Sequence, residues 1–127
     1  MTQKPSLGRR ALGALGEQIA ARAYRRRGCE IIARNARTRY GELDLVARDG
    51  DVLIFCEVKT RRSHSAGAPA DAIDARKQAR LAQLAEAWRL QHPQLMTLDC
   101  RFDAALVARD GIHWRVEIIE DAFRPGW

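Results

Sequence analysis

A turn signal between two strand-like segments is the feature that most constrains how this chain can fold. The turn, Arg48-Asp49-Gly50-Asp51, contains an Asp-Gly pair, which is a strong short-range signal for a β-hairpin. The segments on either side, 42–47 and 52–60, are rich in Leu, Ile, Val and Phe and alternate as strands do. We therefore expect an antiparallel hairpin at this place in the chain.

Two further segments carry apolar side chains at the spacing of an α-helix. The first runs from Ser6, a potential cap, to about Arg27 and stops at Gly28, because a glycine tolerates the backbone that ends many helices. The second runs from Pro69, which suits a first helical turn, to about Gln91. The small, polar segment between the hairpin and this second helix predicts a mobile loop.

The remaining apolar segments predict strands at 29–35, 97–108 and 112–119, the last two joined by a second Asp-Gly turn. The order is then helix, three strands, helix, two strands. This order predicts an α/β or α+β fold in which a mixed sheet of about five strands is flanked by helices. With 127 residues the chain fits one compact domain, residues 1–127, with loose ends expected at 1–7 and 123–127.

The charge of the chain is concentrated near its amino terminus. The whole sequence carries a net charge of +6; residues 1–40 hold ten basic and two acidic side chains, a balance of +8, which leaves −2 for the rest. A basic region on a near-neutral body suggests a surface for a polyanion such as nucleic acid. A solvated helix face is the alternative interpretation, and charge alone does not separate the two.

Nothing in the sequence predicts association with a membrane. The longest run of large apolar residues, Val52–Cys56, is far too short to span a bilayer. The pair Arg9-Arg10 resembles the start of an export signal, but Glu17 interrupts the apolar segment that should follow. The three cysteines are widely spaced, and they predict reduced thiols rather than disulfides or a zinc site. We therefore expect a cytoplasmic protein.

The expected hairpin gathers charged residues on one face. If the turn is centred on Asp49-Gly50, paired residue numbers sum to 99, which places Asp44 opposite Phe55 and diagonal to Glu57. The other face is apolar throughout and is expected to be the core. Two carboxylates at this spacing repel unless a cation lies between them, and hard oxygen ligands select Mg²⁺ or Mn²⁺. Lys59 points the same way; an exposed strand face with a Glu–Lys pair is the alternative interpretation.

These residues also resemble a known signature. Asp44, a spacer of twelve residues and then Glu57-Val58-Lys59 resemble the D…(D/E)xK motif of the restriction-endonuclease-like nuclease superfamily. Over residues 12–122 the chain more closely resembles the YraN-like family of small bacterial proteins. The matching stretches are Leu15-Gly16-Glu17, Arg34-Asn35, Gly41-Glu42-Leu43-Asp44-Leu45, the segment from Phe55 to Arg61, Lys77-Gln78 and Arg101-Phe102-Asp103.

The resemblance implies a restriction-endonuclease-like core and a Mg²⁺-dependent phosphodiesterase similar to archaeal Holliday-junction resolvases. It implies that Asp44 and Glu57 are metal ligands and that Lys59 orients a water or stabilises charge. It also implies that Glu17, on the first helix, completes the metal site. Glu17 could equally pair with an arginine on the helix surface.

We therefore expect a Mg²⁺- or Mn²⁺-dependent DNA endonuclease that hydrolyses phosphodiester bonds and is directed by branched or junction structure. The alternative is a non-catalytic nucleic-acid-binding module of the same fold that acts with a DNA-processing partner. A homodimer is expected only from the symmetric substrate of the resolvases. We interpret Asp103 as a hinge or structural acid and Trp88 as a core residue. The candidate nucleic-acid-binding residues are Arg9, Arg10, Arg61, Arg62, Lys77 and Gln78.

Overall fold

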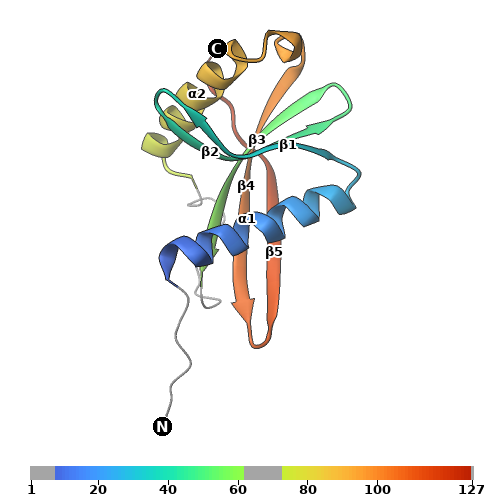
Figure 1. Ribbon diagram of the computed structural model, residues 1–127, viewed down its shortest axis with the longest axis vertical. Helices are drawn as coiled ribbons and strands as arrows, with labels where there is room; N and C mark the ends of the chain where they lie inside the picture. The colour runs from blue at the N-terminus through green and yellow to red at the C-terminus, as the bar shows by residue number, and fades with distance from the viewer. Residues whose placement is uncertain (1–7, 62–72, 127) are drawn as a thin grey trace.

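A computed structural model describes residues 8–61 and 73–126 of the chain. Within these residues the chain forms two α-helices and a five-stranded mixed sheet, in the order that the sequence predicts. The elements are α1 (Arg9–Arg26), β1 (Glu30–Thr38), β2 (Gly41–Asp49), β3 (Val52–Arg61), α2 (Ala75–Leu90), the 3-10 turn η2 (Pro93–Leu95), β4 (Asp99–Asp110) and β5 (His113–Phe123), as Figure 1 shows.

The five strands lie in the order of the sequence, β1-β2-β3-β4-β5. Strands β3 and β4 run parallel, and the other neighbouring pairs are antiparallel. A parallel pair needs a long crossover, and the segment that contains α2 supplies it. No helix in the described part of the chain is long and apolar enough to cross a bilayer.

The two helices begin and end for different local reasons. Helix α1 stops before Gly28, whose φ of +86° confirms the predicted glycine stop. The predicted cap, Ser6, lies outside the described residues. Helix α2 begins after Asp74, whose carboxylate accepts the backbone N–H of Lys77 at 2.9 Å and so caps the first turn. The predicted start at Pro69 also lies outside the described residues.

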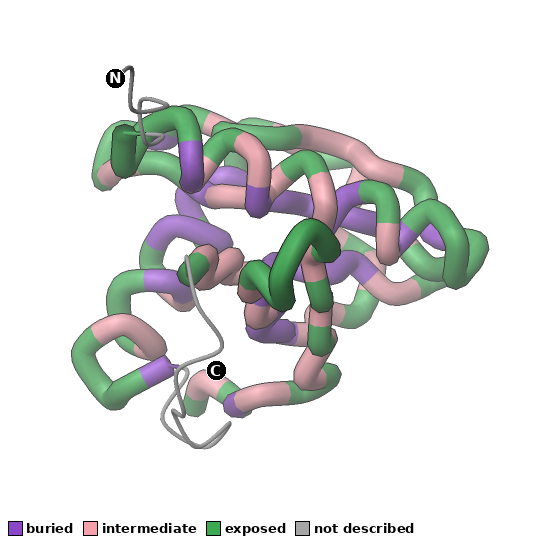
Figure 2. The backbone as a smooth tube through the Cα atoms, turned by 90° about the horizontal axis from the view of Figure 1, so that it is seen from below, coloured by how far each residue is buried: buried purple, intermediate pink, exposed green. Residues whose placement is uncertain are grey.

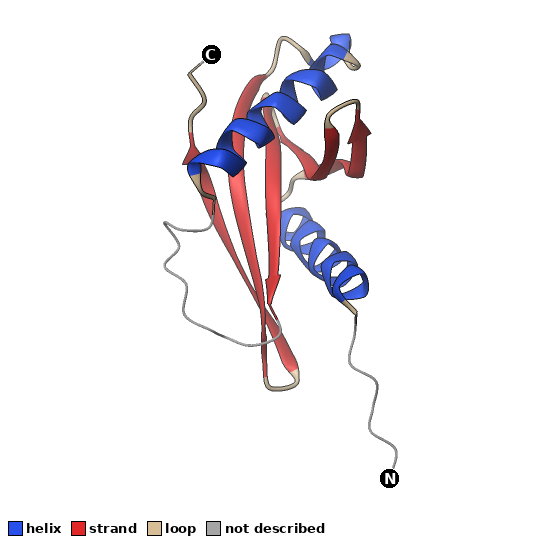
Figure 3. Cartoon of the chain, turned by 90° about the vertical axis from the view of Figure 1, so that its left-hand side faces the viewer, coloured by secondary structure: helices blue, strands red, loops and turns tan. Residues whose placement is uncertain are grey.

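Hydrophobic clusters cover both faces of the sheet, and α1 and α2 lie on opposite sides of it (Figure 3). Buried residues run along the central strands, between the two helices (Figure 2). The apolar face of the hairpin is core, as predicted, and the opposite face is buried as well, because its Leu53 and Phe55 are fully buried under α2. Trp88, from α2, is buried there and meets the Phe55 ring edge-on, with centroids 5.8 Å apart, as predicted for a core residue.

The last strand extends further than its sequence pattern predicts. Phe123, placed at the start of a loose end by the sequence, is the final residue of β5 and is buried. Its ring lies 4.8 Å from that of Phe102 on β4, measured between centroids. The irregular end of the described chain therefore begins one residue later, at Arg124.

The register of the β2–β3 hairpin differs from the predicted one by two residues. Phe55 pairs with Val46 rather than with Asp44, so the paired numbers sum to 101. The reason is that the two-residue loop is Gly50-Asp51, not Asp49-Gly50, and Gly50 takes the positive φ of +59°. The shift is even, so the paired residues from Leu45 to Asp49 keep their predicted faces, but Asp44 moves along β3 to the level of Glu57.

Candidate active site

Asp44 lies at the point where β2 and β3 separate. Regular pairing of the two strands ends at Leu45 and Cys56, one residue before Asp44 and Glu57. Beyond that point, Oδ2 of Asp44 accepts a 2.9 Å hydrogen bond from the backbone N–H of Val58. This bond satisfies an N–H that the ladder no longer pairs. It also holds the Asp44 carboxylate beside the segment of β3 that carries the other predicted site residues.

A local change in β1 and β2 accompanies this placement of Asp44. Asn35 on β1 has a left-handed backbone, with φ of +51°, and lies between the residues that pair with Leu43 and Leu45. Leu43 and Leu45 would share one face of a regular strand. Instead Leu43 packs in the cluster under α2, and Leu45 packs in the cluster under α1. Strand β2 therefore turns over at Asp44, which directs this carboxylate to the fork instead of a helix-covered face.

Glu17 reaches the site because α1 approaches β3 closely. At Gly16 a Cβ atom would overlap the side chain of Thr60, so only a glycine fits against β3 here. The Glu17 carboxylate interacts with the side-chain amide of Asn35 and with the Asp44 charge. Glu17 therefore lies on the Asp44 side of the site.

The three carboxyl groups share an environment that disfavours their charged forms. Burial raises the pKa of Glu17, the Asp44 charge adds to this effect, and the resulting pKa is about 7. Burial likewise raises the pKa of Asp44, although the Val58 N–H opposes the shift. Burial raises the pKa of Glu57 too, with Lys77 opposing the shift and Asp44 adding to it. Asp44 is thus the central member, coupled to the other two.

Two lysines lie on the Glu57 side of the site. Nζ of Lys77, from the first turn of α2, lies 3.9 Å from Oε1 of Glu57. Lys59 lies close to Lys77 as well; burial lowers the pKa of Lys59, and the Lys77 charge lowers it further. Sequence reasoning placed Lys77 among the phosphate contacts but missed its contact with Glu57. The capping residue Asp74, which aligns the start of α2, is the sequence signal that indicates where Lys77 lies.

The donor atoms in this cluster are carboxylate oxygens, the kind that a hard divalent cation prefers. Oε2 of Glu17 and Oε2 of Glu57 are buried and have no hydrogen-bond partner among the described residues. Across residues 8–61 and 73–126, however, no three His, Cys, Asp or Glu side chains gather closely enough to hold a metal by themselves. Mg²⁺ commonly binds through one or two carboxylates and keeps several waters. The three carboxylates therefore suit such a cation in kind, whereas their spacing in the described residues does not by itself enclose one.

The candidate nucleic-acid-binding residues lie in several surroundings. Arg9 and Arg10, at the start of α1, and Arg61, at the end of β3, are exposed. The side-chain amide of Gln78 donates to the carbonyl of Ile73, at 3.0 Å, so this group is already used within the chain. The sixth candidate, Arg62, lies outside the described residues.

Asp103 is fully buried and acts as a structural acid. Its carboxylate accepts hydrogen bonds from the Tyr24 hydroxyl at 2.6 Å, from Arg101 at 2.9 and 3.0 Å, and from the backbone N–H of Asp121 at 3.0 Å. These bonds join α1, β4 and β5. Asp103 therefore belongs to the scaffold and not to the site, in agreement with its interpretation as a structural acid.

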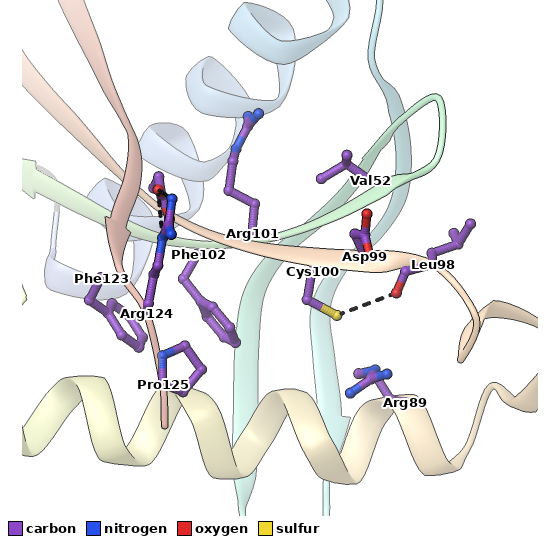
Figure 4. Close-up of a pocket in the computed structure, with 11 residues that line it drawn as sticks. Val52, Arg89, Leu98, Asp99, Cys100, Arg101, Phe102, Phe123, Arg124 and Pro125 are labelled. Carbon is purple, nitrogen blue, oxygen red and sulfur yellow. Dashed lines mark hydrogen bonds and ion pairs between the residues drawn. The ribbon is translucent and has the colours of Figure 1, made fainter. Parts of the chain in front are cut away.

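A separate pocket of about 690 Å³ opens at the other end of the β3–β4 pair (Figure 4). It lies around Val52 and the first residues of β4, whereas Glu57 and Lys59 are in the second half of β3. Two of its arginines are already paired: Arg101 binds Asp103, and Arg124 binds Asp121. The pocket therefore shares no side chain with the carboxylate cluster.

Comparisons with known proteins match almost the whole chain. A model of the uncharacterised protein family UPF0102 matches residues 16–107, which include all four predicted catalytic residues. The chain is 49% identical over 118 residues to a UPF0102 protein of Magnetococcus marinus, covering 93% of this chain and 95% of the relative. It is 49% identical over 114 residues to one from Frankia casuarinae, with 89% and 96% covered. It is 47% identical over 120 residues to one from Syntrophotalea carbinolica, with 94% and 97% covered.

Proposed function

The chain belongs to the uncharacterised protein family UPF0102, the YraN family, and from the geometry of its site we propose that it is a metal-dependent endonuclease of branched or junction DNA. The observation that carries the proposal is the hydrogen bond from the Val58 N–H to Asp44, at 2.9 Å. This bond brings Asp44 to the fork of β2 and β3. There it lies next to the segment of β3 that carries the Glu57 carboxylate and the Lys59 ammonium group.

Glu17, Asp44 and Glu57 would hold the cation, Mg²⁺ or Mn²⁺. A bound cation would polarise the scissile phosphate and lower the pKa of a coordinated water. The raised pKa values of the three carboxyl groups support this role, because they reflect burial of the carboxylates and, for Glu17 and Glu57, the nearby negative charge of Asp44. The unpartnered oxygens of Glu17 and Glu57 support it as well.

Lys59 would orient the attacking water or counter the negative charge that develops on the phosphate. It follows Glu57 by two residues and lies beside the ammonium of Lys77. A compact ammonium suits this role, because it can approach a phosphate oxygen from several directions. We assign Lys77 a double role: it restrains Glu57 and adds a second positive charge near the phosphate.

Basic residues around the cluster would hold the DNA backbone without reading its bases. Arg9, Arg10 and Arg61 are exposed, and Gly16 packs against Thr60, so the amino-terminal half of α1 approaches the carboxyl end of β3. Contacts to phosphate position a protein on nucleic acid but carry no sequence information. This arrangement supports recognition of DNA shape.

One observation favours the alternative, a non-catalytic nucleic-acid-binding module that acts with a partner. The described residues contain no closed group of three metal ligands. If substrate phosphate does not complete the coordination, the same surface would bind DNA without cutting it. A partner or a second copy of the chain would then have to supply the chemistry.

The test is cleavage of labelled single-stranded, duplex, flap and four-way-junction DNA in Mg²⁺ or Mn²⁺. The variants Glu57→Gln and Lys59→Ala are prepared in the same way as the wild type. The matched control is Glu86→Gln, because Glu86 is an exposed acid on α2, outside the site. We expect the wild type and the control to cut branched DNA and the two site variants to lose that activity. Cutting that persists in both site variants would come from a contaminant, and binding without cutting would leave the alternative module.

A further inference from the structure

The β4–β5 hairpin continues beyond the rest of the sheet. Strand β3 ends at Arg61, which pairs with Ala108, whereas β4 runs on to Asp110 and β5 returns from His113. Figures 1 and 3 show this two-stranded arm projecting past the end of β3. We name residues 108–115 the hairpin arm. A two-stranded ribbon of this kind is narrow enough to enter the major groove of DNA.

The tip of the hairpin arm carries an unusually exposed apolar side chain. Ile112 is 85% exposed, against 64% for Leu90 and 46% for Tyr40, the other exposed large hydrophobic residues in the described chain. The turn itself does not require isoleucine, because Gly111 takes the positive φ of +63°. Single exposed apolar side chains are common on protein surfaces. What distinguishes Ile112 is its place at the tip of an arm that extends beyond the end of β3.

Two guanidinium groups lie beside this apolar tip. Arg109 donates to the Gly111 carbonyl at 3.2 Å and lies over the ring of Trp114, 6.0 Å from its centroid. Arg115 pairs with Asp110 at 2.7 Å. Both arginines are exposed, and they lie on the two strands of the hairpin arm, on either side of the turn that carries Ile112. An apolar tip flanked by guanidinium groups fits a base pair flanked by phosphates better than it fits an apolar protein surface.

The hairpin arm extends from the same end of the sheet as the carboxylate cluster. Lys59 is level with Leu106 on β4, and four further residues lead to Asp110. At about 3.3 Å per strand residue, the tip lies about 13 Å beyond Lys59 along the strand. This is the length of about four base pairs of duplex DNA.

We propose that the hairpin arm is a nucleic-acid wedge: Ile112 packs against the open base pair at a branch point, while Arg109 and Arg115 contact the flanking phosphates. This inference rests on the proposed function and adds the element that would select branched DNA. Inserting an apolar side chain into a duplex requires unstacking a base step, whereas a branch already exposes an unstacked face. The wedge therefore favours branched over linear DNA and sets the distance from the branch to the cut.

The test measures binding without cleavage, in EDTA, so that its outcome does not depend on catalysis. Fluorescence anisotropy compares a four-way junction with a linear duplex of equal length, for the wild type, Ile112→Ser and the matched control Leu90→Ser. We expect Ile112→Ser to bind the junction about fivefold more weakly and the duplex about as well as the wild type does. Leu90→Ser should bind both like the wild type, and melting curves establish that each variant is folded.

A second measurement places the tip on the DNA. With 2-aminopurine at the branch point, the wild type and Leu90→Ser should raise its emission by unstacking it, and Ile112→Ser should not. Equal junction binding and equal emission in Ile112→Ser would overturn the wedge but leave the proposed function standing, because cleavage tests that separately. The wedge would also be overturned if Ile112→Ser bound the junction and the duplex equally more weakly than the wild type does. The same holds if the substitution changed only the self-association of the protein. A wild type that binds neither DNA would reject both proposals.

Discussion

The hydroxyl of Tyr24 donates a 2.6 Å hydrogen bond to the buried carboxylate of Asp103, joining α1 to β4 across 79 positions of the sequence. Asp103 is level with Cys56 on β3, one residue before Glu57. The helix that carries Glu17 is therefore tied to the sheet at a point next to the site. Burial and the negative charge of Asp103 keep the Tyr24 hydroxyl protonated by raising its pKa.

Replacing Tyr24 by Phe removes one of the hydrogen bonds to Asp103 and keeps the aromatic packing. We expect a loss of about 1.5–3 kcal/mol in the free energy of unfolding, because a bond to a buried charged group is removed. Urea denaturation of Tyr24→Phe measures it. The comparison variant, Tyr40→Phe, changes an exposed tyrosine and should leave the midpoint unchanged. A Tyr24→Phe midpoint equal to that of the wild type would contradict this account of the network.

Replacing Gly16 by Ala should destabilise the protein, since the new methyl group overlaps Thr60. The expected loss is about 1–3 kcal/mol, the usual cost of overpacking, and a displaced α1 would also move Glu17 away from Asp44. Thermal unfolding and junction cleavage are the measurements.

Gly13→Ala is the matched control for Gly16→Ala. Gly13 lies in the same helix with open space around it, so alanine there should stabilise the protein by about 0.5–1 kcal/mol. A gain of stability in both alanine variants would contradict the close packing of Gly16 against Thr60.

The raised pKa of Glu17 predicts that the stability of the protein depends on pH. Its pKa in the folded protein, about 7, is above the ordinary value of 4.5, so the folded state binds more protons between these values. Stability should therefore fall as the pH rises from about 4.5 to about 7. Glu17→Gln should remove this slope and be more stable than the wild type above pH 7. The gain is about 1 kcal/mol, because partial exposure screens the carboxylate. Parallel stability curves from pH 4.5 to 8 would contradict the prediction.

Asp44→Asn separates cation binding from folding. The asparagine carbonyl can still accept the Val58 N–H, so we expect the fold to be retained while one negative charge is lost. In the wild type, Mg²⁺ or Mn²⁺ at ten times its Kd should raise the free energy of unfolding by about 1.4 kcal/mol. In Asp44→Asn most of that increase should disappear. Thermal shift at several cation concentrations measures it, and an equal shift in both proteins would exclude Asp44 as a ligand.

Lys77→Ala tests the second lysine of the site. Its ion pair with Glu57 is long, at 3.9 Å, and partly exposed, so stability should change by less than about 1 kcal/mol. Cleavage of junction DNA should fall by about tenfold or more, because a positive charge beside the phosphate is lost. Arg76→Ala, the exposed neighbouring position, is the control. Equal activity in the two variants would remove Lys77 from the site.

The order of elements and the charged residues of the hairpin could be predicted from the sequence alone. Alternation along β2 and β3 and the Asp-Gly turn are local signals, and so is the glycine stop of α1. These signals predict that Asp44, Glu57 and Lys59 lie near one another on the hairpin, but they do not predict that β2 turns over at Asp44. The register of the β2–β3 hairpin could not be predicted from the sequence. It depends on whether Asp49 or Gly50 begins the loop, and packing on both faces of the sheet decides this.

Only the tertiary structure decided which residues meet at the site. Glu17 approaches Asp44 because α1 packs against β3 through Gly16, and Lys77 reaches Glu57 because α2 starts at Asp74. These contacts join segments far apart in the chain, and side-chain periodicity describes only neighbours along it. The sequence by itself determined which charged residues are candidates for the site and on which helix or strands they lie. The packing of the two helices on a five-stranded sheet determined their spacing, burial and pKa.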